Sequence, residues 1–376
     1  MTRLPSPPPH FTVVGHAGHR RVALFAEAAR AAGLAEPTVL PWLDVLRGTY
    51  RLTPGTWVRL DSPGEDETVD RLLRGPALGA GYAPTRVEGG AAWYAGLRAA
   101  LEGLAAAVRA TPGAVLLGDP GEIATMFDKR ATHRLLDAAG VPVPAALDQS
   151  AGPVLGWADL RERLAAAGLP RVFVKPAHGS SASGVLALEF GPRGQVQATT
   201  SAELVGGELH NSLRVRRHRA EPEIAAIVDR LAPDGVQVER WIPKASQGGR
   251  AADLRVVVVA GRATHAVVRT SRSPMTNLHL GGARGDLALA VETAGAHWPE
   301  LLVVCERAAA CFPRSPMVGV DLLPATGWRR SHIGEVNAFG DLLPRLTGLP
   351  GSPAEGLDTH RAQLAALLHP PRTPAP

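Results

Sequence analysis

The start of the chain alternates between strand-like and helix-like segments, and this alternation limits the folds open to it. Residues 11–15 (FTVVG) are a short apolar run typical of a buried strand. An Ala-rich stretch from Val22 to Ala32 predicts a helix that ends at Gly33, and residues 38–40 return to an extended pattern. This order is typical of an α/β layer domain. We expect further strands at 56–60 and 114–117, and helices at 65–73 and 91–108.

From residue 123 onward the strands are expected to follow one another as hairpins, which predicts an α+β arrangement. Residues 126–144 predict an amphipathic helix that is closed by Gly140 and two prolines. Residues 171–175 (RVFVK) and 185–190 flank a loop of small residues and predict a hairpin. Further hairpins are expected over 253–270 and 318–340, a strand over 236–242, helices over 286–294, 301–311 and 359–368, and a disordered tail over 369–376.

The composition excludes several classes of protein. Gly (41 of 376 residues) and Pro (33) are frequent and 45% of the chain is apolar, as in a globular protein with many turns. No stretch approaches the roughly 20 apolar residues of a membrane span, and the first ten residues lack a secretory signal. Cys305 and Cys311 fall on different faces of an expected helix, which argues against a disulfide framework or a zinc site. We expect a cytoplasmic protein without membrane contacts.

The basic residues are almost all arginines, since only three of the 40 are lysines: Lys129, Lys175 and Lys244. The net charge of +5 suggests a polyanion partner, but the arginines are scattered and read as a compositional bias. The one dense run, residues 214–219, is more often a solvated face. We therefore expect no specific nucleic-acid partner. Because lysine is rare here, the three lysines are candidate functional positions, where a compact ammonium group rather than a guanidinium is required.

Two carboxylates near the C-terminus are placed symmetrically about residue 328. If a turn is centred there, Asp321 and Glu335 lie opposite each other on antiparallel strands, and Asn337 lies on the same face. Two carboxylates and an amide oxygen suit Mg²⁺, which completes its shell with substrate phosphates. The alternative is a solvated strand face, but the neighbouring residues are apolar and a buried unpaired carboxylate is costly.

Two further segments are compatible with nucleotide binding. Lys175 precedes a Gly- and Ser-rich loop, residues 178–184, whose backbone N–H groups and hydroxyls leave room for phosphates. Taken alone, such a loop is a flexible surface loop. The strand at 236–242 (VQVERWI) offers the backbone of Trp241 and Ile242 and the Glu239 carboxylate to an adenine. Taken alone, it is a core strand.

Together these segments resemble, in the same order, those of ATP-grasp enzymes, nearest to the RimK-like, glutamate-ligase-type branch. The resemblance covers roughly residues 123–346. It rests on six segments: DKRATHRLLDAAGVPVP, VFVKPAHGSSASGV, QVERWI, ADLRVVVV, TNLHLGG, and the pair GVDLL and GEVNAFG. Residues 11–120 are compatible with the α/β domain that usually precedes these segments, and the Gly–Ser loop is more similar to that of the dipeptide-ligase branch.

The resemblance implies a residue for each role. ATP would be bound by Lys129, Lys175, Ser180, Ser181, Glu239, Arg240, Trp241, Ile242, Asp253 and Asn277. Mg²⁺ (or Mn²⁺) would be held by Asp321, Glu335 and Asn337. Arg255 would face the reacting phosphoryl group or acyl phosphate. Met275 stands where nearer relatives carry an arginine, so Arg269 or Arg272 is expected to replace it, and Lys244 is left as a surface or hinge residue.

The fold implied by the resemblance has four parts. They are an N-terminal Rossmann-like domain (1–122), the central lobe (123–238) and C-terminal lobe (239–350) of an ATP-grasp fold, and a terminal helix with a Pro-rich tail (351–376). The implied activity is an ATP- and Mg²⁺-dependent carboxylate–amine ligase that works through an acyl phosphate. A kinase that phosphorylates a hydroxyl and an ATP-binding regulatory protein without turnover are the alternatives.

The partners implied are a carboxylate and an amine, each a small molecule or a peptide. Arg59 is a candidate to bind a carboxylate substrate, because it ends a strand of the first domain; a surface arginine is the alternative. Dimers are common among the enzymes that the chain resembles, so a homodimer is compatible with the sequence.

Overall fold

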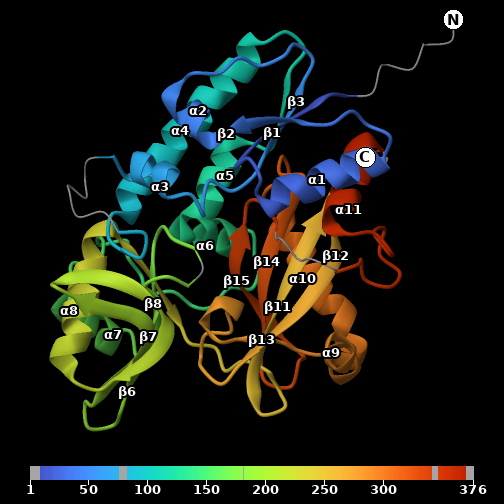
Figure 1. Cartoon of the computed structure of the whole chain (residues 1–376). Coiled ribbons are helices and arrows are strands. Elements are labelled where there is room, and N and C mark those ends of the chain that lie inside the picture. Colours follow the sequence, from blue (N-terminus) through green and yellow to red (C-terminus); the bar gives the residue numbers. More distant parts are fainter. Residues whose placement is uncertain (1–8, 76–82, 181, 341–345, 370–376) are drawn as a thin grey trace, which may run out of the picture.

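The computed structural model describes residues 9–75, 83–180, 182–340 and 346–369, and its strands form three sheets (Figure 1). The first sheet is parallel, with the order β2-β1-β3-β4. Its strands are β1 (Phe11–Gly15), β2 (Thr38–Pro41), β3 (Trp57–Leu60) and β4 (Val115–Leu117). The helices of this layer are α1 (Arg20–Ala31), α2 (Trp42–Arg47), α3 (Glu67–Arg74), α4 (Gly90–Ala110) and α5 (Pro120–Phe127). The α/β start predicted from the sequence is confirmed.

The second sheet is antiparallel, with the order β8-β7-β6-β5-β9. Its strands are β5 (Arg171–Pro176), β6 (Leu186–Phe190), β7 (Val196–Val205), β8 (Glu208–His218) and β9 (Val236–Arg240). Helices α7 (Trp157–Ala166) and α8 (Glu221–Leu231) bury their apolar sides in the same core as this sheet, and η2 (Ala232–Asp234) follows α8. The sequence patterns do not predict β7, β8, α7 or α8.

The third sheet is also antiparallel, with the order β13-β12-β11-β14-β15, and β10 pairs with β11. Its strands are β10 (Ser246–Gln247), β11 (Arg250–Val259), β12 (Arg262–Ser271), β13 (Ala283–Arg284), β14 (Met317–Pro324) and β15 (Ser331–Asn337). Helices α9 (Leu287–Ala294) and α10 (Trp298–Ala310) share one apolar core with it. The short helices η3 (Leu278–Leu280) and η4 (Gly295–His297) and the terminal helix α11 (Thr359–Leu368) complete the described elements.

The predicted helix over 126–144 is wrong at its start, because the structure divides this region into two helices. Helix α5 ends at Phe127 and α6 (Lys129–Ala138) begins directly after Asp128. The Asp128 carboxylate accepts hydrogen bonds from the backbone N–H groups of Arg130 and Ala131, at 2.9 and 3.2 Å. Asp128 is thus the N-cap of a new helix, and this cap places Lys129 in the first turn.

Arg59 is not a substrate-binding residue at a strand end. It is 2% exposed, and its guanidinium lies 2.6 Å from Asp61 Oδ1 and donates to Gln363 Oε1 at 3.0 Å. Gln363 belongs to α11, which packs beside α1 (Figure 1). Arg59 therefore fastens the C-terminal helix to the first sheet.

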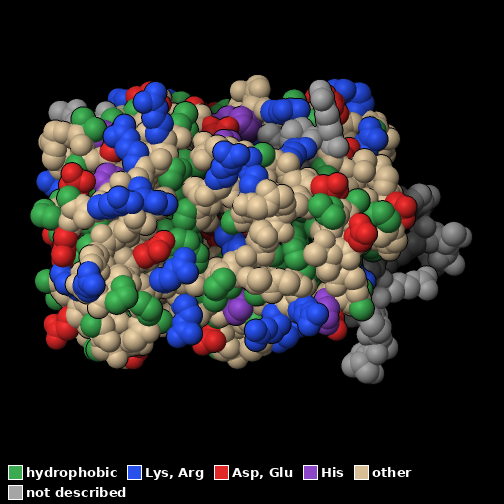
Figure 2. Space-filling model, turned by 90° about the horizontal axis from the view of Figure 1, so that it is seen from below, with side chains coloured by type: hydrophobic (Ala, Val, Ile, Leu, Met, Phe, Trp, Pro, Cys, Tyr) green, Lys and Arg blue, Asp and Glu red, His purple; other side chains and the backbone are tan. Residues whose placement is uncertain are grey.

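On the face that Figure 2 presents, charged side chains are spread out rather than gathered into one region. Figure 2 shows Lys and Arg interspersed with Asp and Glu over the face that it presents. The basic run over 214–219 lies largely on β8, where Arg214, Arg216 and Arg217 are exposed. Among the described residues, no helix is long and apolar enough to cross a membrane.

Candidate functional site

Strand pairing in the third sheet brings five charged side chains onto one face. Arg255 on β11 pairs with Asp321 on β14, and Asp321 pairs with Glu335 on β15. Asp253, two residues before Arg255 and on the same face, pairs with Arg269 on β12. The predicted opposition of Asp321 and Glu335 is therefore confirmed. Opposite charges face each other at Arg255–Asp321 and at Asp253–Arg269, whereas Asp321 and Glu335 are like charges on adjacent strands, which is unfavourable unless cations lie nearby.

A register shift directly after this row adds a backbone group to the site. Asp321 pairs with Glu335 but Leu322 pairs with Ile333, so Gly334 is an extra residue in β15. The Gly334 carbonyl oxygen accepts a hydrogen bond from Lys175 Nζ at 3.3 Å. Bulges of this kind re-aim groups next to active sites.

Asp321 is neutralised by two arginines. Its Oδ1 accepts a short hydrogen bond from Arg255 Nε, and its Oδ2 lies 3.2 Å from Arg269 Nη2. Burial opposes ionisation, but the charges of Arg255 and Arg269 outweigh it and hold the pKa of Asp321 below its usual value. Of the two arginines expected to replace Met275, Arg269 is the one at the site, because Arg272 is exposed.

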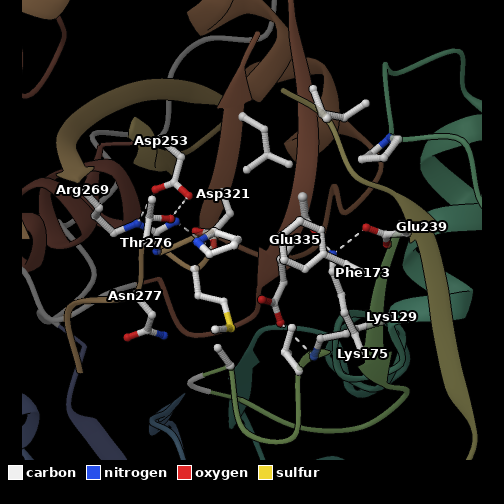
Figure 3. Close-up of a pocket in the computed structure, with 18 of the residues that line it drawn as sticks. Lys129, Phe173, Lys175, Glu239, Asp253, Arg269, Thr276, Asn277, Asp321 and Glu335 are labelled. Carbon is white, nitrogen blue, oxygen red and sulfur yellow. Dashed lines mark hydrogen bonds and ion pairs between the residues drawn. The ribbon is translucent and has the colours of Figure 1, made fainter. Parts of the chain in front are cut away.

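Asp253 is the centre of a second buried cluster (Figure 3). Its Oδ1 accepts a hydrogen bond from Arg269 Nε at 2.8 Å. Its Oδ2 accepts one from Thr276 Oγ1 and lies 3.1 Å from Lys244 Nζ. Burial opposes ionisation, yet Arg269 and Lys244 hold the pKa of Asp253 below its usual value. Asp253 thus positions two cations at the site.

Lys244 is not the surface residue expected from the sequence. Its side chain is 8% exposed, and its Nζ lies 3.0 Å from Thr276 Oγ1. Together with Lys129 and Lys175 it lines one cavity, so all three lysines of the chain meet there. The rarity of lysine in an arginine-rich sequence was the signal that could have identified Lys244.

The two lysines predicted to bind phosphates each form an ion pair with a carboxylate. Lys129 Nζ lies 3.1 Å from Glu335 Oε1 and donates to the Gly179 carbonyl at 2.6 Å. Lys175 Nζ donates to Glu239 Oε2 at 2.5 Å. Lys175 and Glu239 meet because β5 and β9 are paired and their side chains are diagonal neighbours. Each of these ion pairs neutralises one of the lysines that line the cavity.

The Gly- and Ser-rich loop over 178–184 lies at the mouth of this cavity. Ser180 is exposed and lines the cavity, whereas Ser181 lies outside the described residues. Gly184 has a φ of +69°, and a Cβ there would lie 2.7 Å from Val87 Cγ1. Only glycine suits this position, which ends the loop.

His178 fixes the other end of the same loop. Its ring stacks on Tyr94 of α4, with centroids 4.0 Å apart and planes 10° apart. Its Nδ1 lies 3.2 Å from the Phe127 carbonyl oxygen. Burial lowers the pKa of His178, which favours the neutral ring. Neither His178 nor Tyr94 is assigned this role by the sequence analysis.

The lysines and the carboxylates line a cavity of about 150 Å³ between the second and third sheets. The lining of the cavity is partly charged and partly apolar. Its apolar residues include Phe173, Val185, Ile242, Met275 and Leu323. An apolar slot beside convergent cations suits a base that is joined to phosphates.

The predicted hinge over 239–242 contributes three of its four residues to this cavity. Glu239, Arg240 and Ile242 line it, whereas the Trp241 ring packs 5.2 Å from the Phe173 ring, between centroids. The backbone N–H of Trp241 donates to the Arg171 carbonyl at 2.9 Å, so this backbone N–H is not available to a nucleotide.

A second cavity of about 400 Å³ adjoins the first and extends toward the first sheet. Residues from α1, α4 and the segment before α3 line its far end. The two cavities share residues of the charged row and of the loop: Gly179, Ser180, Arg255, Arg269, Asn277, Glu335 and Asn337. The charged row therefore stands at the junction of two cavities.

Three side chains with oxygen donors line the first cavity near this junction: Asp321, Glu335 and Asn337. Asn337 Nδ2 donates to the Gly319 carbonyl at 3.1 Å, which leaves Asn337 Oδ1 as the atom that can bind a cation beside Asp321 and Glu335. In the described part of the chain, no three or more His, Cys, Asp or Glu residues are grouped to hold a metal. Two carboxylates and an amide suit a cation that takes its other ligands from substrate phosphates and water.

The chain matches neither a protein-family sequence model nor a curated protein sequence. Solved structures do match it along its length. The D-cycloserine synthetase DcsG matches with a TM-score of 0.57 and 18% identity, over 95% of this chain and 98% of that one. The ATP-grasp ligase PsnB, complexed with a minimal precursor, matches with a TM-score of 0.53 and 17% identity, over 96% of this chain and 98% of that one. The ADP complex of purK, N5-carboxyaminoimidazole ribonucleotide synthetase, matches with a TM-score of 0.50 and 13% identity, over 91% of this chain and 73% of that one.

At these identities the likeness is one of fold, and it covers all three sheets of the chain. It agrees with the order of the six sequence segments between residues 123 and 346. The chain therefore has the ATP-grasp fold.

Proposed function

We propose that the protein is an ATP- and Mg²⁺-dependent ligase that joins a carboxylate to an amine through an acyl phosphate. The observation that carries this proposal is the junction of the two cavities. Arg255 and Glu335 line both cavities, and Asp321, which pairs with each of them across the sheet, lines the first. Phosphates at the junction would face a carboxylate in the second cavity.

In this proposal ATP occupies the first cavity. Its base lies against the apolar residues of the lining beside residues 239–242, and its phosphates reach Lys129 and Lys175. Ser180, Ser181 and the rest of the loop over 178–184 close over the phosphates and exclude water from the activated substrate. Asp253 acts by holding Lys244 and Arg269 in place, and Asn277 stands at the junction.

The metal would be held by Asp321, Glu335 and Asn337. Bound Mg²⁺ (or Mn²⁺) neutralises the charge that develops on the phosphates during transfer. Glu335 must then exchange its ion pair with Lys129 for the metal, and the Lys129 ammonium becomes free to bind a phosphate oxygen.

The proposed reaction is the one that the resemblance to ATP-grasp enzymes implies. An oxygen of the substrate carboxylate attacks the γ-phosphorus, and ADP leaves with the electrons of the broken P–O bond. The amine nitrogen then attacks the acyl carbon, phosphate leaves, and the nitrogen loses a proton. Arg255 and Arg269 stabilise the negative charge on the transferred group, because both lie at the junction.

The matched structures support this reaction class. PsnB has been solved as an ATP-grasp ligase complexed with a minimal precursor, Mg and ADP, at a TM-score of 0.50. DcsG is a D-cycloserine synthetase. We infer a small-molecule or peptide carboxylate and an amine as substrates, and a homodimer is compatible with the proposal.

The proposal is tested by trapping with hydroxylamine. The protein is incubated with ATP, Mg²⁺, hydroxylamine and a panel of carboxylates, and both ADP and hydroxamate are measured. We expect hydroxamate with wild type and with the exposed control Arg272→Ala, and none with Arg255→Ala. Phosphorylated hydroxyl compounds without hydroxamate would show a kinase instead, and ATP binding without ADP formation would show a regulatory protein.

A further inference from the structure

The far end of the second cavity carries an arginine that the reaction does not use. Arg21 lies in the first turn of α1, is half-buried and lines the cavity. Its neighbour Arg20 is exposed and does not line the cavity. A cation in the first turn of a helix is disfavoured by the helix dipole. The helix dipole therefore does not favour an arginine at position 21.

Arg21 is also the cavity charge that lacks a partner at this end. Within the described ranges, the Arg21 guanidinium forms no ion pair. Glu65 lines the same end, with a φ of +75°, but its carboxylate is bound by His19 Nε2 at 2.8 Å and its side chain is 72% exposed. Arg284 also lines the cavity, on β13, where its backbone lies opposite that of Arg269 on β12.

One wall of the same cavity is aromatic. Trp93 and Phe127 have ring centroids 5.5 Å apart, and Phe127 and Phe339 have centroids 5.8 Å apart. All three residues line the cavity, in a chain of which only 5% is aromatic. They come from α4, α5 and the segment after β15, so three separate elements converge there. Such a wall binds a planar apolar group by stacking.

We infer that the second cavity selects an elongated substrate with a planar apolar body and a second anionic group, which Arg21 binds at the end remote from ATP. The body packs against Trp93, Phe127 and Phe339, and the reacting carboxylate lies at the junction. A guanidinium recognises a carboxylate and a phosphate equally well in geometry, so either anion is compatible with the site. The inference rests on the proposed function, because that function places a carboxylate in this cavity.

The test compares four probes by calorimetry on the full chain, with and without the ATP analogue AMPPNP and Mg²⁺. The probes are 3-phenylpropanoate and its para-carboxy, para-phosphono and para-aminomethyl derivatives. We expect the carboxy or the phosphono probe to bind about 10-fold or more tightly than the parent compound, as for a charge-assisted hydrogen bond. Whichever of the two binds more tightly identifies the anion.

Variants at neighbouring positions separate the role of Arg21 from a general effect of charge. Arg21→Gln is expected to remove the preference for the anionic probe, and the matched control Arg20→Gln to keep it. Equal binding of all probes, tighter binding of the aminomethyl probe, or equal behaviour of the two variants would overturn the inference. AMPPNP binding is measured in the same samples. If the protein binds AMPPNP but shows no preference for the anionic probes, this inference alone is wrong. If it prefers the anionic probes but binds no AMPPNP, the proposed function is wrong.

Discussion

Lys129 Nζ lies 3.1 Å from Glu335 Oε1, and the two side chains are 12% and 28% exposed. One of these residues is proposed to bind phosphate and the other to bind metal. The ion pair neutralises both side chains before a ligand enters. ATP with its metal brings the opposite charge for each partner, so binding exchanges one set of ion pairs for another.

Replacing Glu335 tests the proposed metal site. Glu335→Gln removes one anionic ligand and keeps the shape, so we expect Mg²⁺-dependent ADP formation to fall at least 100-fold, on the order of a lost charged contact to the transition state. The protein should still fold, because the side chain is partly exposed. The melting temperature of the variant is measured beside its activity. A folded variant with wild-type turnover would remove Glu335 from the metal site.

Replacing Asp253 tests the buried cluster. Asp253→Asn leaves Arg269 and Lys244 without their shared anion, and breaking a buried ion pair in this way costs about 3–5 kcal/mol. Urea unfolding measures the difference. The control Glu67→Gln breaks an exposed pair with Arg71 on α3 and is expected to cost under about 1 kcal/mol. Similar losses in both variants would mean that the cluster around Asp253 adds no stability.

Lowering the pH should reduce the free energy of unfolding, because His360 of α11 is buried in its neutral form. Burial and then Arg59 lower the pKa of His360 from 6.5 to about 4, and neither ring nitrogen has a partner among the described residues. Between pH 6.5 and 4 the unfolded chain binds a proton that the folded chain does not, so stability is lost as the pH falls. The loss amounts to about 3 kcal/mol for a shift of this size.

Unfolding by urea at several pH values checks this prediction. The variant His360→Leu has no titrating group at this position, so its stability should fall less steeply between pH 6.5 and 4 than that of wild type. Parallel curves for the two proteins would show that His360 is protonated equally in the folded and unfolded chains.

Features that depend on residues close together in the chain could be predicted from the sequence. The register of Asp321 and Glu335 follows from their symmetric spacing about one turn, and strand pairing preserves it despite the bulge at Gly334. Residues 359–368 were predicted as a helix and form α11. These predictions succeed because a hairpin and a short helix depend on neighbouring residues.

The long-range parts were not accessible in the same way. Lys244 is buried because Asp253 and Thr276, which are distant in sequence, supply its partners. Arg59 ends a strand, as expected for a substrate-binding residue, but Gln363 from the last helix covers it. Both outcomes depend on contacts between segments that no local pattern encodes. The second cavity also arises only where the first and third sheets meet.

The central claim is that this chain binds ATP with a metal at the junction of the two cavities. The most direct measurement is a calorimetric titration of AMPPNP, with and without Mg²⁺, on wild type and on Lys175→Ala. We predict binding that Mg²⁺ strengthens and that Lys175→Ala weakens at least 10-fold, as expected for a lost contact to a charged group. A folded wild-type protein that binds no AMPPNP at any Mg²⁺ concentration would contradict the claim, and the ligase proposal would fall with it.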